Sequence, residues 1–209
     1  MSDAMSIPGP ESGKLVEEEQ QWLAPGIQRL ATLAGVAMRS GQGVFLEDED
    51  GNSFLDFMAG VCVASLGHSH PRWVSAISHQ ASQLAIGSFT SEARLNLLKL
   101  LASLLPDPLH RVQFYSGGAE AVESAIRLAK AKTGKFEVVS FWGGFHGKTG
   151  GVLSLIGDPF NRGWGPLTPG SHLVPYADCA RCPLKTRYPG CGLACVDLAR
   201  EQLRAASLG

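Results

Sequence analysis

The sequence lacks the long apolar runs, the charge excess and the leader that mark several classes of protein. Its apolar runs are short and broken by glycine, serine or proline, far from the roughly 20 residues that a membrane-spanning helix needs, so we expect no membrane partner. With 18 Lys+Arg against 19 Asp+Glu, the formal net charge is −1, and no basic surplus points to nucleic acid. The first residues show no apolar core flanked by positive charge, which predicts a cytoplasmic protein without a secretory signal.

Apolar residues, glycine and a group of cysteines are what the 209 residues do contain. The chain is 44% hydrophobic and 18% charged, which is typical of a globular protein with a buried core. There are 25 glycines, a residue used where the backbone turns tightly or approaches a ligand. Of the five cysteines, Cys62 stands alone and the other four lie within residues 179–195.

Helical and strand-like segments alternate along the chain, which predicts an α/β fold with a parallel sheet. Residues 1–13 are expected to be a disordered leader, 14–60 a small N-terminal subdomain segment, and 61–209 the start of a large α/β domain. The expected helices cover residues 15–23, 71–84, 91–105, 119–132, 149–156 and 191–207, and the expected strands residues 44–47, 53–57, 111–115 and 136–141. Because no strand follows the last helix, we expect the sheet, and therefore the chain, to be incomplete.

A Ser-Gly-Gly turn joins one expected strand to the strongest expected helix. After the strand 111–115 come Ser116, Gly117 and Gly118, and the helix is expected to begin at Ala119. The free N–H groups and the dipole of a helix start attract anions, and glycine lets a phosphate approach the backbone. The alternative is an ordinary tight turn capped by Ser116, and the turn alone does not decide between the two.

A second glycine-rich loop, residues 142–148, follows the expected strand 136–141. Its aromatic residues are suited to stacking on a planar ligand at the carboxyl end of the strand, where open α/β sheets bind ligands. The alternative is that Trp142 and Phe145 fill the core beneath the loop and that His146 caps it.

Taken together, in this order and spacing, the segments resemble the class III family of pyridoxal-phosphate-dependent aminotransferases (fold type I, ω-aminotransferase-like). Residues 116–123 resemble the family's N-S-G-A-E-A-V-E turn and helix, and residues 145–149 its F/Y-H-G-R-T loop. Residues 44–56 resemble its D-x-x-G-x-x-Y-L-D hairpin, and residues 60–71 its G-[IV]-x-V-x-x-x-G-H-x-H-P stretch. The resemblance implies the pyridoxal-phosphate-dependent transferase fold type I, of which this chain would hold only the N-terminal segment and the first part of the large parallel-sheet domain.

The resemblance also implies a cofactor, pyridoxal 5'-phosphate, and residues that bind it. Gly117, Gly118 and Ala119 match the turn that binds the cofactor phosphate through backbone N–H groups. Phe145 matches the aromatic residue that stacks on the pyridine ring, and His146 matches its neighbour, with a positioning role.

Upstream, the resemblance implies substrate-pocket residues. Val61 matches a residue on the pocket wall, and Cys62 lies beside it. His68 and His70 look like a metal-binding pair, but the family uses them as structural loop residues before a helix, and we do not assign them to a metal.

The resemblance implies two catalytic residues that have no counterpart in this chain. Transamination needs a Schiff-base lysine and an acid, an aspartate, that keeps the pyridine nitrogen protonated; in the family they lie in a D-E-[VI]-Q stretch and a later lysine loop. No expected strand here is followed by a D-E-[VI]-Q stretch. None of the lysines has a matching context; they are residues 14, 99, 130, 132, 135, 148 and 185. We therefore expect an N-terminal half that does not turn over alone.

The four clustered cysteines form a C-x-x-C…C-x-x-x-C pattern. Cys179, Cys182, Cys191 and Cys195 have the spacing of thiolate pairs that hold zinc or an iron–sulfur cluster. The competing interpretation, which we favour at this stage, is a loop of reduced thiols without a metal.

Three functions follow from these observations. The first is an aminotransferase that moves an amino group from an amine or ω-amino acid donor to a keto acid acceptor, as a homodimer in its full-length form. The second is a non-catalytic truncated paralogue, or half of a split enzyme, that docks on a partner subunit. The third is a small cysteine-rich metal-binding module. Aminomutase or decarboxylase chemistry on the same fold stays open.

Overall fold

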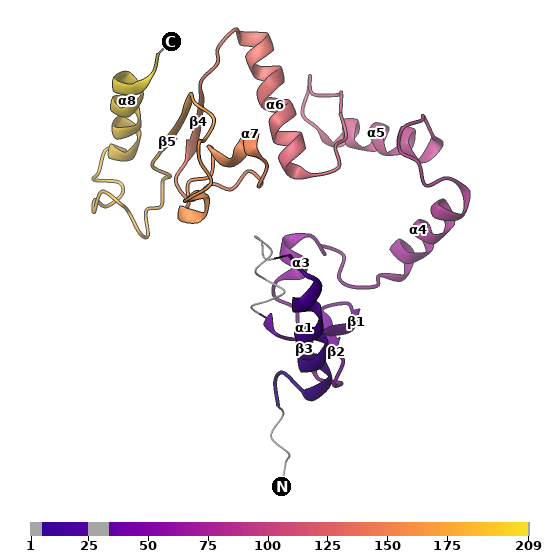
Figure 1. Ribbon diagram of the computed structural model, residues 1–209. Helices are drawn as coiled ribbons and strands as arrows, with labels where there is room; N and C mark the ends of the chain where they lie inside the picture. The colour runs from indigo at the N-terminus through magenta and orange to yellow at the C-terminus, as the bar shows by residue number, and fades with distance from the viewer. Residues whose placement is uncertain (1–5, 25–33, 209) are drawn as a thin grey trace. The chain divides into compact units, whose positions relative to one another are not determined.

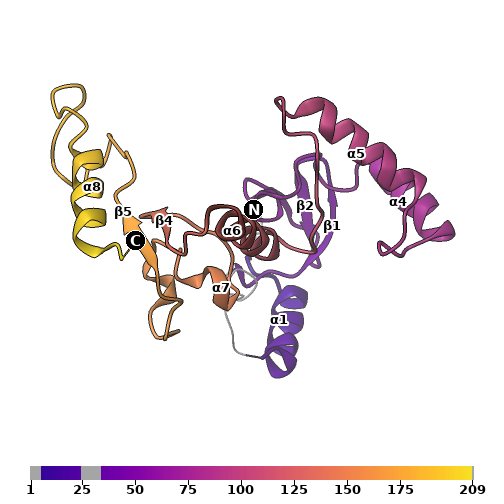
Figure 2. The same cartoon turned by 90° about the horizontal axis from the view of Figure 1, so that it is seen from above.

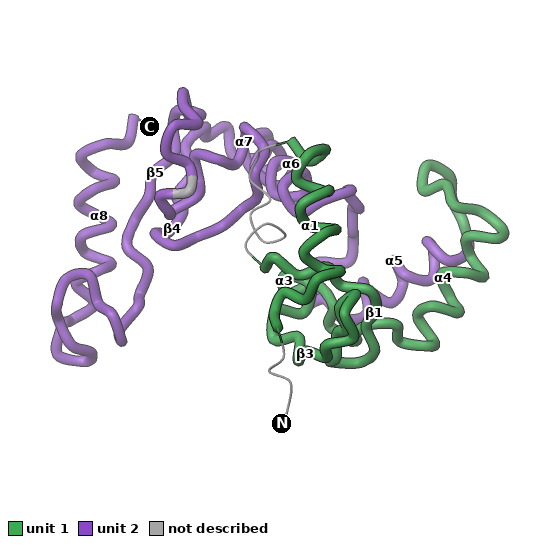
Figure 3. The backbone as a smooth tube through the Cα atoms, turned by 60° about the horizontal axis from the view of Figure 1, so that its bottom comes forward, with its two compact units in different colours: residues 1–91 green, residues 92–209 purple. Residues whose placement is uncertain are grey.

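The computed structural model describes residues 6–24 and 34–208 and divides the chain into two compact units, residues 1–91 and 92–209 (Figure 1, Figure 3). The division falls later than the boundary expected after residue 60, because residues 61–91 group with the N-terminal unit. How the residues divide between a small and a large domain of the family stays a prediction. No helix in the described part of the chain is long and apolar enough to cross a membrane.

Unit 1 begins with helix α1 (Pro10–Trp22). The expectation of a disordered leader over residues 1–13 is therefore wrong for its last four residues, while residues 1–5 lie outside the described part. The reason is a cap from a distant turn: Asp50 accepts hydrogen bonds from the backbone N–H groups of Glu11 (2.9 Å) and Ser12 (2.8 Å). Burial opposes ionisation of this carboxyl, but the donors from Ser12 and Glu11 lower the pKa of Asp50. A charged cap at the positive end of a helix stabilises it.

The centre of unit 1 is a three-stranded antiparallel sheet in the order β1 (Met38–Gln42), β2 (Phe45–Asp48), β3 (Ser53–Leu55). The β2–β3 hairpin confirms the prediction from the D-E-D-G-N turn, whereas β1 was not expected. Asp48 is fully buried in the turn. It accepts hydrogen bonds from the N–H of Asp50 and from the N–H and side-chain amide of Asn52 at 2.7–3.0 Å, so the turn's donors are satisfied internally.

Two further helical segments follow the sheet in the described part of unit 1: the short α3 (Ala59–Cys62) and α4 (Pro71–Gln83). Helix α4 confirms the prediction of a helix over residues 71–84. Its first residue is a proline, which has no N–H to lose at that position and a fixed φ suited to a helix.

Unit 2 is a mixed α/β unit. In chain order its elements are α5 (Glu92–Leu104), α6 (Gly118–Thr133), β4 (Val138–Phe141), α7 (Gly150–Leu153), the 3-10 helix η1 (Pro159–Asn161), β5 (Ser171–Val174) and α8 (Ala194–Ala206). Strands β4 and β5 pair in parallel, in a register from Val138 opposite Ser171 to Phe141 opposite Val174, which confirms the parallel sheet. The strand expected over residues 111–115 is wrong, because the structure has no strand there.

The core of unit 2 lies between the sheet and α7 together with the residues that follow it. Its buried apolar residues are Val152, Leu153, Leu155, Ile156 and Val174. Ser140, buried in β4, donates its hydroxyl to the carbonyl of Leu155 at 2.8 Å, which connects this segment to the sheet.

Helix α8 lies beside β5, as two views at right angles show (Figure 1, Figure 2), and its C-terminal end is held by Glu137. That carboxylate accepts hydrogen bonds from the Ser207 hydroxyl and from the Leu208 N–H (2.9 Å), and lies 3.1 Å from Nε2 of His172. These contacts, led by the Ser207 hydroxyl, lower the pKa of Glu137 to about 2.

Candidate functional site

The Ser-Gly-Gly turn leads into helix α6, which begins at Gly118, one residue before the expected start. The N–H of Gly117 donates to the Glu120 carboxylate at 3.1 Å, so the acidic residue of the first turn caps the helix. A Cβ added to Gly117 or Gly118 would meet no heavy atom within 4 Å, and the space beside the turn is open. N–H groups of a first helical turn have no intrahelical acceptors, so this turn can bind an anion.

The structure brings the second predicted segment against this turn. Gly147 has φ 114°, and a Cβ on it would lie 2.4 Å from the Cβ of Ala119. Two residues later, the Thr149 hydroxyl donates to the Glu123 carboxylate. A Cβ on Gly151 would lie 2.6 Å from Oε1 of Glu123. The loop therefore packs directly on the first turns of α6.

The same loop is connected to the carboxyl ends of both parallel strands. The Trp142 N–H donates to the carbonyl of Val174 at 2.9 Å, directly after β4 and at the end of β5. Gly143 donates to the carbonyl of Gly157 at 2.8 Å, and Gly157 donates back to Gly144 at 3.1 Å. The edge where strands of an open α/β sheet end is where such folds bind ligands.

The aromatic residues of this loop do not fill the core. Phe145 is 61% exposed and Trp142 is 39% exposed, which contradicts the alternative that both lie beneath the loop. His146 is half-buried, and a Cβ on Gly144 would lie 3.3 Å from its Nε2. Phe145 is thus an exposed aromatic side chain on the loop that packs on α6.

Val61 and Cys62 lie in a left-handed turn of unit 1 that the sequence analysis missed. From Ala59 to Cys62 the φ angles are 47°, 60°, 66° and 64°, and the Cys62 N–H donates to the carbonyl of Met58 at 2.8 Å. Only Gly60 adopts this conformation without strain, since a left-handed turn costs other residues roughly 1–2 kcal/mol each. Both Val61 and Cys62 are exposed.

The base of this loop is closed by His68. Its backbone exchanges two hydrogen bonds with Gly43, at 2.9 and 2.8 Å, and its Nε2 lies 2.7 Å from the Asp56 carboxylate. Asp56 also accepts from the N–H groups of Met58 and Ala59. The hydrogen bond with His68 is the main cause that lowers the pKa of Asp56, and burial opposes it. His68 therefore has a structural role.

The predicted site residues fall on both units. Gly117, Gly118, Ala119, Phe145 and His146 belong to unit 2, on two segments that meet where Gly147 contacts Ala119. Val61 and Cys62 belong to unit 1, so their participation in the same site stays a prediction.

The four clustered cysteines also lie together, around one pocket that follows β5. None is in a disulfide, and the part of the chain that the structure describes contains no group of three His, Cys, Asp or Glu side chains arranged as a metal centre. A hydrogen bond of 3.4 Å joins Sγ of Cys182 to the Thr186 hydroxyl. This bond, with those from nearby backbone N–H groups, lowers the pKa of the Cys182 thiol.

A family comparison decides what these motifs belong to. The family model described as aminotransferase class III matches residues 28–203. The chain belongs to the class III aminotransferases. The resemblance carried by the turn of α6 and the loop after β4 is thereby confirmed at the level of family and fold.

Individual relatives agree with this assignment. This class III aminotransferase chain is 39% identical to the acetylornithine aminotransferase of Methanopyrus kandleri, over 68% of this chain and 38% of that protein. It is 34% identical to the alanine/serine racemase of Pyrococcus horikoshii, over 81% of this chain and 36% of that protein. The chain therefore spans well under half the length of these relatives.

The fold has close counterparts among solved structures. An (S)-enantioselective ω-transaminase from Thermomicrobium roseum superposes with a TM-score of 0.80 at 24% identity, covering 98% of this chain and 48% of that one. A transaminase from the marine bacterium Virgibacillus gives a TM-score of 0.74 over 93% of this chain. At this level of identity the likeness establishes the fold and not the substrate.

Proposed function

We propose that this chain supplies the phosphate-binding and ring-stacking part of a pyridoxal-phosphate site in an aminotransferase. The reaction moves an amino group from an amine or ω-amino acid to a keto acid. The observation that supports this most strongly is the contact of Gly147 with Ala119, because it places the loop that carries the exposed Phe145 on the first turn of α6.

The residues of unit 2 fit the cofactor by their chemistry. The backbone N–H groups of Gly118 and Ala119 bind the phosphate, helped by the dipole of α6, and the Gly117 N–H joins them when it exchanges the Glu120 carboxylate for the ligand. The exposed ring of Phe145 stacks on the flat pyridine ring, and His146 orients that part of the loop. The cofactor, when bound, supplies an electron sink for bonds at the amino carbon.

Within residues 1–209, no lysine has the sequence context of the family's cofactor lysine, and no Asp-Glu pair continues into the family's D-E-[VI]-Q stretch. We therefore propose that this chain binds the cofactor through its phosphate and ring without a covalent bond, and does not turn over alone. In this proposal Val61 and Cys62 lie on the substrate-pocket wall, and the full-length protein is a homodimer.

The first experiment measures binding of pyridoxal 5'-phosphate to the 209-residue chain by absorbance and fluorescence titration. Pyridoxal without the phosphate serves as the ligand control. In the variant Gly118→Ala the new Cβ occupies the open space beside the turn, and we expect at least about tenfold weaker binding, because glycine is what lets a phosphate reach the backbone. Gly150→Ala, equally free of contacts within 4 Å, is the matched control and should bind like the parent chain.

Two results would contradict the proposal. Equal affinity of the Gly118→Ala and Gly150→Ala variants would remove the phosphate turn from the site. Reduction with borohydride, followed by peptide mass spectrometry, tests the covalent bond: stoichiometric label on a single lysine would show that the chain contains its own cofactor lysine.

A further inference from the structure

Four of the five cysteines surround one small cavity in unit 2, at a place separate from the cofactor motifs. The cavity lies between the end of β5 and the start of α8. Besides apolar and aromatic side chains, it is lined by Cys179, Cys182, Cys191 and Cys195. All four are free thiols.

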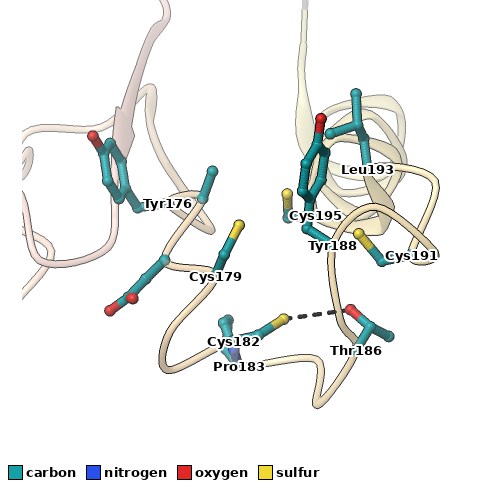
Figure 4. Close-up of a pocket in the computed structure, with 11 residues that line it drawn as sticks. Tyr176, Cys179, Cys182, Pro183, Thr186, Tyr188, Cys191, Leu193 and Cys195 are labelled. Atoms are coloured by element: carbon teal, nitrogen blue, oxygen red, sulfur yellow. Dashed lines mark hydrogen bonds between the residues drawn. The ribbon is translucent and has the colours of Figure 1, made fainter.

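The cavity has the size of a site for a single ion. It holds about 40 Å³ of space, whereas one water needs roughly 10–15 Å³ by the same kind of measure. Figure 4 shows the two C-x-x-C residues on one side of the hollow and the C-x-x-x-C residues on the other. Such a volume is too small for an organic cofactor, and its lining offers sulfur, the ligand that soft metals prefer.

The backbone after Cys182 forms a turn that is closed by the Lys185 N–H, which donates to the Cys182 carbonyl at 3.0 Å; Lys185 has φ 55°. A hydrogen bond of 3.4 Å joins Sγ of Cys182 to the Thr186 hydroxyl. Hydrogen bonds of this kind orient a thiolate and favour it as a metal ligand.

We propose that Cys179, Cys182, Cys191 and Cys195 bind one zinc ion, which joins the loop after β5 to the first turn of α8. In the described residues the thiols surround the cavity without forming a finished metal centre, so binding draws the two pairs together. The segment between Val174 and Ala194 contains no helix or strand and can close in this way.

The chemistry of the step is a proton exchange. Four thiols lose four protons and form four zinc–sulfur bonds of about 2.3 Å, which leaves a net charge of −2 at the centre. Lys185 and Arg187, within the same loop, offset that charge. No electron is transferred, so no oxidant or reductant is needed.

The test is zinc binding by the full chain purified under reducing conditions. We expect elemental analysis to give one zinc per chain after equilibration with micromolar zinc and removal of the excess. Titration with cobalt(II) should give the intense sulfur-to-metal absorption of a tetrahedral thiolate site. Cys182→Ser should weaken zinc binding by more than the roughly 10–100-fold lost when an outer-shell partner is removed. Cys191→Ser should do the same, although Cys191 lies outside the turn that follows Cys182.

Cys62→Ser is the matched control, because Cys62 lies in unit 1 and is exposed; it should keep one zinc per chain. Zinc content below about a tenth of an equivalent in the parent chain would overturn the proposal. Three other results would also overturn it. They are retention of zinc by the Cys182→Ser variant, acid-labile sulfide with bound iron, and a mass below that of the fully reduced chain, which would show disulfides among the four cysteines even under reducing conditions. The cobalt titration of the parent chain needs no variant, so a misfolded variant does not decide the result.

Discussion

The contact between Gly147 and Ala119 gives the sharpest test of how the loop after β4 is held against α6. In Gly147→Ala the new Cβ would lie 2.4 Å from the Ala119 Cβ and 2.8 Å from its Cα. Carbon atoms pack best at about 3.5–4.0 Å, so the loop must move by roughly 1 Å. The backbone at φ 114° is also a conformation that alanine rarely adopts.

The expected loss in the free energy of unfolding follows from these two costs, the steric overlap and the unfavourable backbone conformation. Overpacking of this kind destabilises by about 1–3 kcal/mol, and an unfavourable backbone conformation adds on the order of 1 kcal/mol. We expect Gly147→Ala to lower the free energy of unfolding of unit 2 by about 2–4 kcal/mol. A displacement of roughly 1 Å is also enough to impair a site that depends on position, so proposed cofactor binding should fall with it.

Urea denaturation monitored by circular dichroism, together with hydrogen exchange of peptides covering α6 and residues 143–151, measures the effect. Gly150→Ala, which meets no atom within 4 Å, should differ from the parent chain by less than about 0.5 kcal/mol. A loss of less than 0.5 kcal/mol in Gly147→Ala itself would refute the packing of the loop on α6.

Three other predictions concern stability. Since the pKa of Glu137 is lowered to about 2 from 4.5, its contribution is complete above pH 4.5 and is lost as the pH falls toward 2; Glu137→Gln should flatten stability against pH in that window, as acid titration by circular dichroism would show. Asp50→Ala removes the cap of α1, and amide exchange of α1 should accelerate while that of α8 stays the same; unchanged α1 exchange would contradict the cap. Val61→Gly removes the strain of a valine in the left-handed backbone conformation and should raise the free energy of unfolding of unit 1 by about 1 kcal/mol. Thermal melts that show a destabilised variant would argue against the left-handed turn at residues 59–62.

Local chemistry made some elements predictable. The D-E-D-G-N turn predicted the hairpin because its side chains satisfy the turn's own donors, as Asp48 does. Helices α4 and α6 followed from a leading proline and from an amphipathic pattern. In each case the signal lies within a few residues of the element that it specifies.

Elements that depend on distant partners were missed. Residues 111–115 have a β-type sequence, but no strand in the described part of the chain pairs with them, and a strand needs its ladder. Conversely, β5 is four residues long between prolines and glycines, and only its pairing with β4 makes it a strand. Helix α1 begins early because of Asp50, nearly forty residues away in the sequence.

The candidate site was predictable as a set of motifs and not as a geometry. Ser116–Gly118 and Phe145 were found by resemblance, but nothing in the sequence indicated that Gly147 would pack against Ala119. The left-handed turn at Val61 was missed because valine and cysteine rarely adopt that conformation; Gly60 was its only local signal.

The loop that carries Val61 and Cys62 is closed at its base by the backbone pairing of Gly43 with His68. At the other end of the loop, the Asp56 N–H donates to the carbonyl of Val44 at 2.9 Å, so both ends are fixed by main-chain bonds that do not depend on which side chains lie at the tip. Replacements at the tip can change the shape and polarity of the exposed surface while the sheet below stays as it is. Such a separation lets selection vary recognition and foldability independently, and makes the tip a sensible place to concentrate a library of engineered variants.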